Sequence, residues 1–349
     1  MIAADPAVAT AIDGSLARIR DRADELGAGF GALADAIGRA AHGGKGLRPA
    51  LVTAAFAAFH GAEAERPAVL SVAAAFELLH TAFVVHDDVI DHDIERRGVP
   101  NVGGEFRARA RAAGADAAGA ATLGDAAAIL AGDLLLHEAF RLVAMAPAGP
   151  VVKDRLFALL DDAVLVSAAG ELADVENAVS STRPSRTTTL RTAFQKTAVY
   201  SFRAPLQAGA LLAGADPAAV RLLGDVGGRL GLAFQLVDDL IGAFGTAAQT
   251  GRDSGPDLRE TKQTPLIALA RESGAAPGVD TALANAATGP IAVREAQAVL
   301  ASSGARERLA GMVAGMLDEV RVSAQDASLP LRAGVLLRTL ADEIERRIP

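Results

Sequence analysis

Two short acidic stretches with the same layout close long apolar runs in this chain. They are FVVHDDVID at residues 83–91 and FQLVDDLIG at residues 234–242, and in each a phenylalanine precedes a pair of aspartates by four residues. The apolar residues before each pair predict helices that are largely buried. Two long helices that carry aspartates at matching ends are therefore the strongest constraint on the fold.

The first stretch concentrates negative charge on one helix face. Asp87 and Asp91 lie one helical turn apart, with Asp88 beside them. Like charges at this spacing repel, and carboxylates near a helix C-terminus oppose the helix macrodipole. A cation would neutralise them, and oxygen-only clusters suit Mg²⁺, which commonly binds one or two carboxylates and substrate phosphates. For either motif alone, a solvated acidic helix end is the alternative; the repetition favours a metal.

The rest of the sequence favours an all-α fold. About half of the 349 residues are hydrophobic, aromatic residues other than Phe are nearly absent, and strand-like alternation is scarce. No convincing linker divides the chain. Separating the two acidic motifs would also defeat a shared site, so we expect one domain over residues 1–349. Residues 107–124 are rich in Ala, Gly and Arg, and we expect a weak helix and a mobile connection there. We expect Pro205 to kink its helix.

Charge and composition exclude several classes of protein. The net charge of −8 argues against a nucleic-acid binder, which would normally show a basic face. The chain has no cysteine, which excludes disulfides, thiolate zinc sites and cysteine nucleophiles. The N-terminus lacks the basic start and apolar core of a signal peptide, and no uninterrupted apolar run reaches the length of a membrane span. We therefore expect a cytoplasmic protein without a transmembrane segment.

Several cations lie in or near predicted turns, one of which is the glycine-rich HGGKGLRP at residues 42–49. They are Lys45, Arg48, Arg96, Arg97, Lys196, Arg252 and Lys262. Separated cations and two acidic patches around apolar helices suit a substrate with more than one polyanionic head and an apolar tail. Lys and Arg can bind phosphate directly, and Arg can do so through two parallel hydrogen bonds.

The motifs, taken in order, resemble those of the trans-isoprenyl diphosphate synthases. They are GGKGLRP at 43–49, DDVID at 87–91 followed by RRG at 96–98, KT at 196–197 and FQLVDD at 234–239. Together they span residues 43 to about 265, and several motifs in one order make the match specific. More narrowly, LHTAF at 79–83 and DDLIG at 238–242 resemble actinobacterial geranylgeranyl diphosphate synthases.

The resemblance implies an all-α bundle around a deep apolar cavity, usually dimeric, with several Mg²⁺ ions per active site. It implies that Asp87, Asp88 and Asp91 bind Mg²⁺ on an allylic diphosphate. Asp238 and Asp239 would supply ligands from the opposite side.

The same resemblance implies substrate-binding roles. Isopentenyl diphosphate would be held by Lys45, Arg48, His80 and Arg97. The allylic diphosphate would be contacted by Arg96, Lys196 and Lys262. Thr197 and Gln235 would direct oxygen dipoles toward the developing carbocation. Ionisation of the allylic substrate would be followed by condensation with isopentenyl diphosphate and loss of a proton. The released diphosphate would accept that proton, as is proposed for the family.

Two residues depart from the family pattern. Gly242 stands where many members carry a third Asp, which weakens one expected metal contact. Arg252 stands where the family usually has Lys; it keeps the charge with a different geometry.

Ala82 and Phe83 resemble the family's pair that determines product length, and they point about 100° apart on a helix. An alanine beside a phenylalanine predicts a C20 product, geranylgeranyl diphosphate, and changing Ala82 to Phe should shorten it. Phe83 as an ordinary core residue is the alternative.

Other functions remain open from the sequence alone. The product could be farnesyl or a longer diphosphate, made from a dimethylallyl, geranyl or farnesyl starter. A class I terpene cyclase shares the ionising aspartates but binds only one diphosphate. The additional cations Lys45, Arg48 and Arg97 therefore argue against a cyclase. A non-catalytic subunit of a heteromeric synthase would be expected to lose its aspartates, yet both pairs remain here. His80 and Gln235 could also be satisfied core residues.

Overall fold

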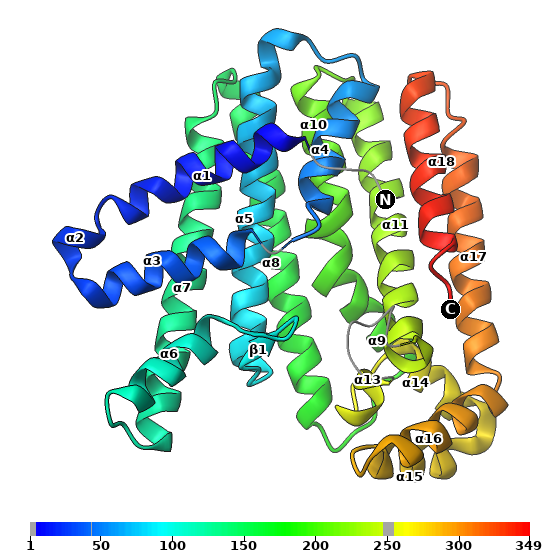
Figure 1. Ribbon diagram of the computed structural model, residues 1–349. Helices are drawn as coiled ribbons and strands as arrows, with labels where there is room; N and C mark the ends of the chain where they lie inside the picture. The colour runs from blue at the N-terminus through cyan, green and yellow to red at the C-terminus, as the bar shows by residue number, and fades with distance from the viewer. Residues whose placement is uncertain (1–4, 43, 247–254) are drawn as a thin grey trace. The chain divides into compact units, whose positions relative to one another are not determined.

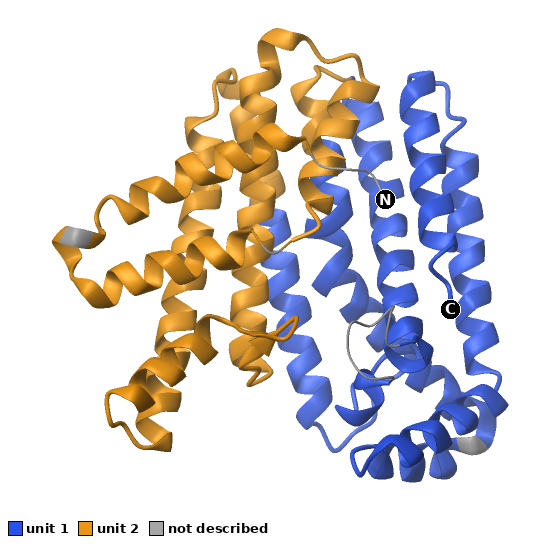
Figure 2. Ribbon diagram, viewed as in Figure 1, with its two compact units in different colours: residues 1, 161–207, 216–349 blue, residues 2–160, 208–215 orange. Residues whose placement is uncertain are grey.

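A computed structural model describes residues 5–42, 44–246 and 255–349, and its regular structure is almost entirely helical (Figure 1). The chain divides into two compact units, coloured separately in Figure 2. Unit 2 consists of residues 2–160 and 208–215, and unit 1 consists of residue 1, residues 161–207 and residues 216–349. The all-α class predicted from the sequence is confirmed. The single domain over residues 1–349 stays a prediction.

Unit 2 is built from the amino-terminal helices and the only two strands in the described ranges. Its elements are α1 (Pro6–Arg20), α2 (Ala23–Leu26), α3 (Ala28–Ala41), α4 (Leu47–Ala58), η1 (Glu63–Glu65), α5 (Arg66–Ile90), β1 (Glu95–Arg96), β2 (Val99–Pro100), α6 (Val102–Ala112), α7 (Ala117–Met145) and the first part of α8 (Pro150–Val179).

Unit 1 contains the rest of α8 and most later helices. These are α9 (Arg186–Ala193), η2 (Phe194–Arg203), part of α10 (Ala204–Leu212), α11 (Pro217–Phe244), α13 (Pro256–Arg259), α14 (Pro265–Ala270), η3 (Arg271–Ala275), α15 (Ala276–Ala286), α16 (Pro290–Ser302), α17 (Ala305–Ser323) and α18 (Leu331–Glu345).

Helix α5 forms the centre of unit 2. Pro67 occupies its first turn, where a missing N–H costs little, and the helix ends at the first acidic motif as predicted. Every residue from Val72 to Leu79 is buried, and the helix packs against α1, α4 and α7. Apolar burial stabilises a fold by roughly 25 cal/mol per Å², so a helix buried on every side fixes the acidic residues at its end firmly.

Helix α11 has the corresponding position in unit 1 and carries the second acidic motif at its C-terminal end. It packs against η2, α17 and α18. The η2 segment is a π-helix immediately before Pro205. Proline cannot donate the helical hydrogen bond and its ring crowds the preceding turn, and a π-helical turn is a common accommodation. The irregularity expected at Pro205 is therefore present as a local widening of the helix.

The expectation of a mobile connection within residues 107–124 is wrong. Helix α6 extends to Ala112, and α7 begins at Ala117, five residues later. Asp116 caps α7, since its side chain accepts a hydrogen bond from the Gly119 backbone N–H at 2.8 Å. The high alanine content of this stretch favours helix, which outweighs its scattered glycines.

Two helices are long and apolar enough to cross a membrane by length and composition. They are Glu63–Ile90, of whose most apolar window 72% is buried in the structure, and Ala117–Met145, with 39% buried. The first is a core helix, which passes the same test. The second leaves much of its apolar surface exposed.

Candidate active site

The first acidic motif is partly neutralised by an arginine from the β-hairpin. The guanidinium of Arg96 donates to the Asp88 Oδ1 from Nε at 2.9 Å and from Nη2 at 2.5 Å. The same Nη2 lies 3.6 Å from Asp87 Oδ2. Asp88 is 4% exposed. Burial raises the pKa of its carboxyl, and the hydrogen bond and charge of Arg96 oppose this rise. Asp91 forms the C-cap of α5 and is exposed.

A tight hairpin turn places Arg96 and Arg97. Strands β1 and β2 pair with Arg96 opposite Val99, and the two turn residues Arg97 and Gly98 have φ angles of 57° and 77°. Positive φ at both central positions is typical of the type I′ turn, whose twist matches that of the strands. An arginine in this left-handed region costs about 1–2 kcal/mol, and such strain concentrates at functional sites. Asn101 stabilises the hairpin, because its Nδ2 donates a hydrogen bond to the Asp93 carbonyl on the other side of the hairpin at 2.8 Å.

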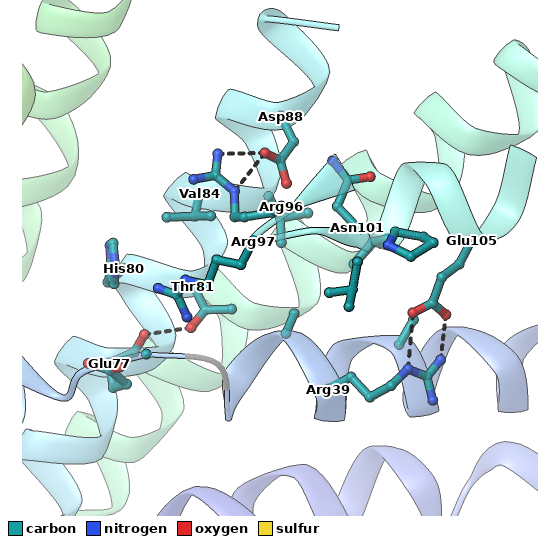
Figure 3. Close-up of a pocket in the computed structure, with 17 residues that line it drawn as sticks. Arg39, Glu77, His80, Thr81, Val84, Asp88, Arg96, Arg97, Asn101 and Glu105 are labelled. Carbon is teal, nitrogen blue, oxygen red and sulfur yellow. Dashed lines mark hydrogen bonds and ion pairs between the residues drawn. The ribbon is translucent and has the colours of Figure 1, made fainter. Parts of the chain in front are cut away.

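A cavity of about 550 Å³ lies within unit 2, beneath these arginines (Figure 3). Its polar lining comes from α3, α5, α6 and the hairpin. The lining residues with charged or polar side chains are Arg39, Glu77, His80, Thr81, Asp88, Arg96, Arg97, Asn101 and Glu105. Three predicted binding residues, His80, Arg96 and Arg97, therefore share this cavity with the metal candidate Asp88. Arg39 is occupied by a two-pronged ion pair with Glu105.

Three arginines act electrostatically on His80, which lines the cavity. Burial lowers the pKa of His80 well below its usual value, and the charges of Arg48, Arg96 and Arg97 lower it further. The imidazole is thus neutral near pH 7, so it can donate a hydrogen bond while the arginines supply the charge. The cavity is lined by three arginines and three carboxylate residues, so it offers cations to a polyanion without carrying a net positive charge.

A buried glutamate, Glu77, balances part of this charge. It is 4% exposed, and burial raises its pKa while Arg48 and Arg97 lower it. Its carboxylate packs against the loop of the GGKGLRP motif, because a Cβ built at Gly44 would lie 2.3 Å from Glu77 Oε1. Lys45 is exposed in that loop and Arg48 is half-buried in the first turn of α4. Glu77 is not among the site residues predicted from the sequence.

The second motif, in unit 1, is built differently. The Thr197 hydroxyl donates to Gln235 Oε1 at 2.8 Å, and Gln235 Nε2 donates to Asp239 Oδ1 at 2.9 Å. Asp239 is 6% exposed, and its other oxygen, Oδ2, has no hydrogen-bond partner among the described residues. Burial raises the pKa of Asp239 well above its usual value, and the charges of Asp257 and Asp238 add to this rise. This carboxyl therefore lies close to two further carboxylates, Asp238 and Asp257.

The first aspartate of the second motif is paired across the sequence. Arg347 donates from Nη2 to Asp238 Oδ1, and its guanidinium lies 4.2 Å from the centre of the Phe234 ring. The Phe234 ring in turn packs against Phe202, with ring centres 5.2 Å apart. Asp238 is 38% exposed and Arg347 is 27% exposed. The guanidinium of Arg347 therefore supplies the positive charge that partly neutralises the Asp238 carboxylate.

The remaining predicted cations have carboxylate neighbours. Lys196 Nζ lies 3.0 Å from both Glu171 and Asp174, which are one turn apart on α8. Lys262 pairs with Glu260 at 3.1 Å. The prediction for Arg252 lies outside the described residues. Ala82 is fully buried and Phe83 is partly buried, and neither lines the cavity of unit 2.

The residues present fit divalent magnesium, which the family resemblance implies. Within residues 5–42, 44–246 and 255–349, no three Asp, Glu, His or Cys side chains already form a geometry that holds a metal ion. Asp239 Oδ2 is buried and has no hydrogen-bond partner among the described residues, so a cation would satisfy it, and both motifs offer carboxylate oxygens. These are the donors that Mg²⁺ prefers.

Sequence reasoning missed four residues of this arrangement. They are Glu77, Glu171, Asp174 and Arg347, none of which is among the site residues predicted from the sequence. Glu77 carried a signal, since it is the only charged residue within the apolar run 67–79. Arg347 carried none, because its partner lies 109 positions away.

Comparison with known proteins places these motifs in a family context. The polyprenyl synthetase family model matches residues 32–300. A geranylgeranyl diphosphate synthase from Mycobacterium tuberculosis is 33% identical over 85% of this chain and 78% of its own length. One from Sulfolobus acidocaldarius is 34% identical over 64% of this chain, which spans 62% of that relative. An octaprenyl diphosphate synthase from Haemophilus influenzae is 33% identical, and 63% of its length is matched.

The fold agrees with these matches. The structure resembles that of geranylgeranyl pyrophosphate synthase from Corynebacterium glutamicum complexed with isoprenyl diphosphate and magnesium, with a TM-score of 0.90, 28% identity and 98% coverage of both chains. The helices, the ordered motifs and the matched residues 32–300 lead to one conclusion: this chain belongs to the polyprenyl synthetase family.

Proposed function

We propose that this protein is a chain-elongating trans-prenyltransferase that condenses isopentenyl diphosphate with an allylic diphosphate, and that its main product is geranylgeranyl diphosphate. The observation that carries the proposal is the cavity of unit 2, in which His80, Arg96 and Arg97 lie beside Asp88. A terpene cyclase has one diphosphate to bind. Arg96 pairs with the metal candidate Asp88, and the further cation Arg97 in the same cavity favours an enzyme that binds two diphosphates.

Bound Mg²⁺ would stabilise the negative charge that develops on the allylic diphosphate as it leaves, an effect worth several kcal/mol. Its ligands would come from Asp87, Asp88 and Asp91 in unit 2 and from Asp238 and Asp239 in unit 1. We expect several ions per active site, since carboxylates of both motifs are available and one Mg²⁺ commonly uses only one or two.

The cations of the chain would divide the two diphosphates between them. Lys45, Arg48, His80 and Arg97 would bind isopentenyl diphosphate. Arg96, Lys196 and Lys262 would bind the allylic diphosphate, and Arg252 would bind substrate phosphate as well. Arg96 and Lys196 would then exchange their present carboxylate partners for phosphate oxygens, which keeps each charge satisfied during substrate binding.

Thr197 and Gln235 would stabilise the carbocation. Their hydrogen-bond chain to Asp239 holds the Gln235 amide in one orientation. Oriented dipoles cost no reorganisation when charge develops, which is why they accelerate ionisation. The cation must meet the isopentenyl double bond before it meets water, so the surrounding apolar side chains matter as much as the charged ones.

Product length gives a direct test. Purified protein would be incubated with isopentenyl diphosphate, Mg²⁺ and a dimethylallyl, geranyl or farnesyl starter. We expect C20 product, and a shorter product from Ala82→Phe, because Ala82 and Phe83 resemble the pair that determines product length in the family. Conversion of the allylic substrate without isopentenyl diphosphate would instead identify a cyclase, and no turnover by the purified protein would favour a non-catalytic subunit.

We also propose a cytoplasmic homodimer. The supporting feature is the exposed apolar face of α7, where Leu123 and Leu130 lie two turns apart and are 41% and 54% exposed. Apolar surface of this kind marks interaction sites on proteins. Sedimentation velocity should give twice the mass of one chain, and Leu130→Glu should shift the distribution toward monomer.

A further inference from the structure

Glu77 is a buried carboxylate in the middle of α5, and it lines the cavity of unit 2 (Figure 3). It is 4% exposed, and its Oε2 is buried without a hydrogen-bond partner among the described residues. An ionised carboxylate away from water is unfavourable unless other charges or donors stabilise it. The surroundings of Glu77 must therefore supply positive charge.

Two arginines from separate elements supply that charge. Burial raises the pKa of the Glu77 carboxyl, whereas the charges of Arg48, in the first turn of α4, and Arg97, in the hairpin turn, lower it. The same two arginines act on His80, which lies about one helical turn further along α5. Glu77, Arg48 and Arg97 thus form one charge cluster, in which a single carboxylate accompanies two cations.

Glu77 also contacts the glycine-rich loop before α4. A Cβ built at Gly44 would lie 2.3 Å from Glu77 Oε1, so a side chain at position 44 would have no room. Glycine at this position lets the carboxylate lie against the loop. The loop belongs to the GGKGLRP motif, whose Lys45 and Arg48 are proposed to bind isopentenyl diphosphate.

Other charged groups on the elements around α5 are either paired, exposed or neutral. The paired groups form three ion pairs, which join Arg96 with Asp88, Arg39 with Glu105, and Arg18 with Glu138. Lys45 is exposed in its loop. His80 is neutral near pH 7, because burial and the nearby arginines lower its pKa well below its usual value. Glu77 is therefore the carboxylate whose charge answers most directly to Arg48 and Arg97.

A diphosphate bound to Arg48 and Arg97 would bring several negative charges close to this carboxylate. Like charges repel, and they do so more strongly away from water, so each disfavours the ionised form of the other. A proton on Glu77 removes the repulsion and turns the carboxyl into a hydrogen-bond donor. The arginines that oppose a proton on His80 stay in place, so His80 gains less from the arrival of the ligand.

We propose that Glu77 is a proton-coupled counter-ion in the cavity of unit 2: its carboxylate balances Arg48 and Arg97 while the cavity is empty, and it takes up a proton from the solvent when a diphosphate binds. This inference rests on the proposed binding of isopentenyl diphosphate and deepens it. Because coupling is reciprocal, the proton and the ligand favour each other equally. Affinity for the ligand therefore falls as pH rises above the pKa of the free Glu77 carboxyl.

Isothermal titration calorimetry with isopentenyl diphosphate, in the absence of metal, tests this on the full chain. The dissociation constant of the natural chain should rise by about three- to tenfold from pH 6 to pH 8. Ionisation of the ligand itself would act in the opposite direction. At pH 7, titrations in two buffers of different ionisation enthalpy should report uptake of about half a proton per bound molecule. The ligand contributes little there, because a phosphate group loses its last proton at about pH 6.

Glu77→Gln keeps the shape of the side chain but cannot take up a proton. At pH 8 it should bind isopentenyl diphosphate about three- to tenfold more tightly than the natural chain, and its proton uptake should vanish. A purely structural role for Glu77 predicts weaker binding instead. Glu63→Gln is the matched control, since it removes an exposed carboxylate just before α5 and should change the dissociation constant by less than about twofold.

Proton uptake that persists in Glu77→Gln, or weaker binding by this variant at pH 8, would overturn the inference. If Glu77→Gln does not fold, His80→Gln decides: uptake should persist in it, and its loss would assign the proton to His80. Product assays run separately. C20 synthesis by a natural chain that binds isopentenyl diphosphate without proton uptake therefore sinks this inference alone, whereas a natural chain that does not bind isopentenyl diphosphate overturns the proposed function as well.

Discussion

The two acidic motifs are similar in sequence, but the structure satisfies them in different ways. In unit 2, Asp88 pairs with Arg96, which lies only eight residues later in the sequence, on a strained hairpin. In unit 1, the one hydrogen bond to Asp239 from a described residue comes from the Gln235 amide, and the charge of its neighbour Asp257 raises its pKa further. In the first motif the arginine pairs with the buried aspartate, Asp88, whereas in the second Arg347 pairs with the more exposed Asp238. We therefore expect metal binding to change the electrostatic environment of the second motif more than that of the first.

The largest expected effect tests what the motifs share. Asp87→Asn and Asp238→Asn each remove the first carboxylate of a motif at nearly constant shape. If both hold Mg²⁺ on the leaving diphosphate, each should lower kcat/KM by about a thousandfold, equal to about 4 kcal/mol of transition-state stabilisation. Steady-state kinetics with isopentenyl and farnesyl diphosphates measures this. Activity above a tenth of normal in either variant would remove that residue from the metal site, and Asp225→Asn is the control.

The second effect separates the motifs by stability. Arg96→Gln leaves the buried Asp88 unpaired and should lower the free energy of unfolding by about 2–4 kcal/mol. Arg347→Gln removes a half-exposed pair and should lower it by less than about 1 kcal/mol. Urea denaturation of the metal-free protein gives both values. Equal losses would contradict the difference in burial between the two ion pairs.

These contrasts show what the sequence could and could not predict. The run of apolar residues ending in Asp87 predicts the buried helix α5, and Gly98 predicts the turn, because both signals are local. The pairing of Arg347 with Asp238 joins residues far apart in the sequence, and no periodic pattern in the sequence predicts it. Residues 107–124 were misjudged because their composition looks loose, although Asp116 is a good helix cap. The sequence shows that Gly242 departs from the family pattern, but the nearness of the Asp257 side chain to it appears only in three dimensions.

A third prediction concerns pH and His80 in the cavity of unit 2. His80 has a pKa lowered by burial and by Arg48, Arg96 and Arg97, so the unfolded chain binds this proton more readily than the folded one. The stability that follows is present above about pH 6.5, the ordinary value, and is lost as pH falls from there toward the lowered pKa, by at most about 1.4 kcal/mol per pH unit. Denaturation of the ligand-free protein between pH 5 and 8 should show this slope, and His80→Gln should flatten it. An unaltered slope in the variant would assign the effect to other groups.

The smallest expected effect concerns the second motif alone. In Arg347→Gln the guanidinium no longer competes for Asp238, so Mg²⁺ should half-saturate activity at a concentration lower by about two- to fivefold, equal to less than about 1 kcal/mol. Arg346→Gln, on the neighbouring residue, is the control and should leave this concentration unchanged. A higher Mg²⁺ requirement in the Arg347 variant would mean that the arginine helps to form the metal site.

Product analysis of the purified protein tests the central claim most directly. Labelled isopentenyl diphosphate, farnesyl diphosphate and Mg²⁺ are incubated with the natural chain, and the products are separated by chain length after removal of phosphate. We predict geranylgeraniol as the main labelled alcohol, and its loss when Mg²⁺ is chelated. Unlabelled cyclic products, or no transfer of label to the allylic substrate, would contradict the proposed prenyl transfer.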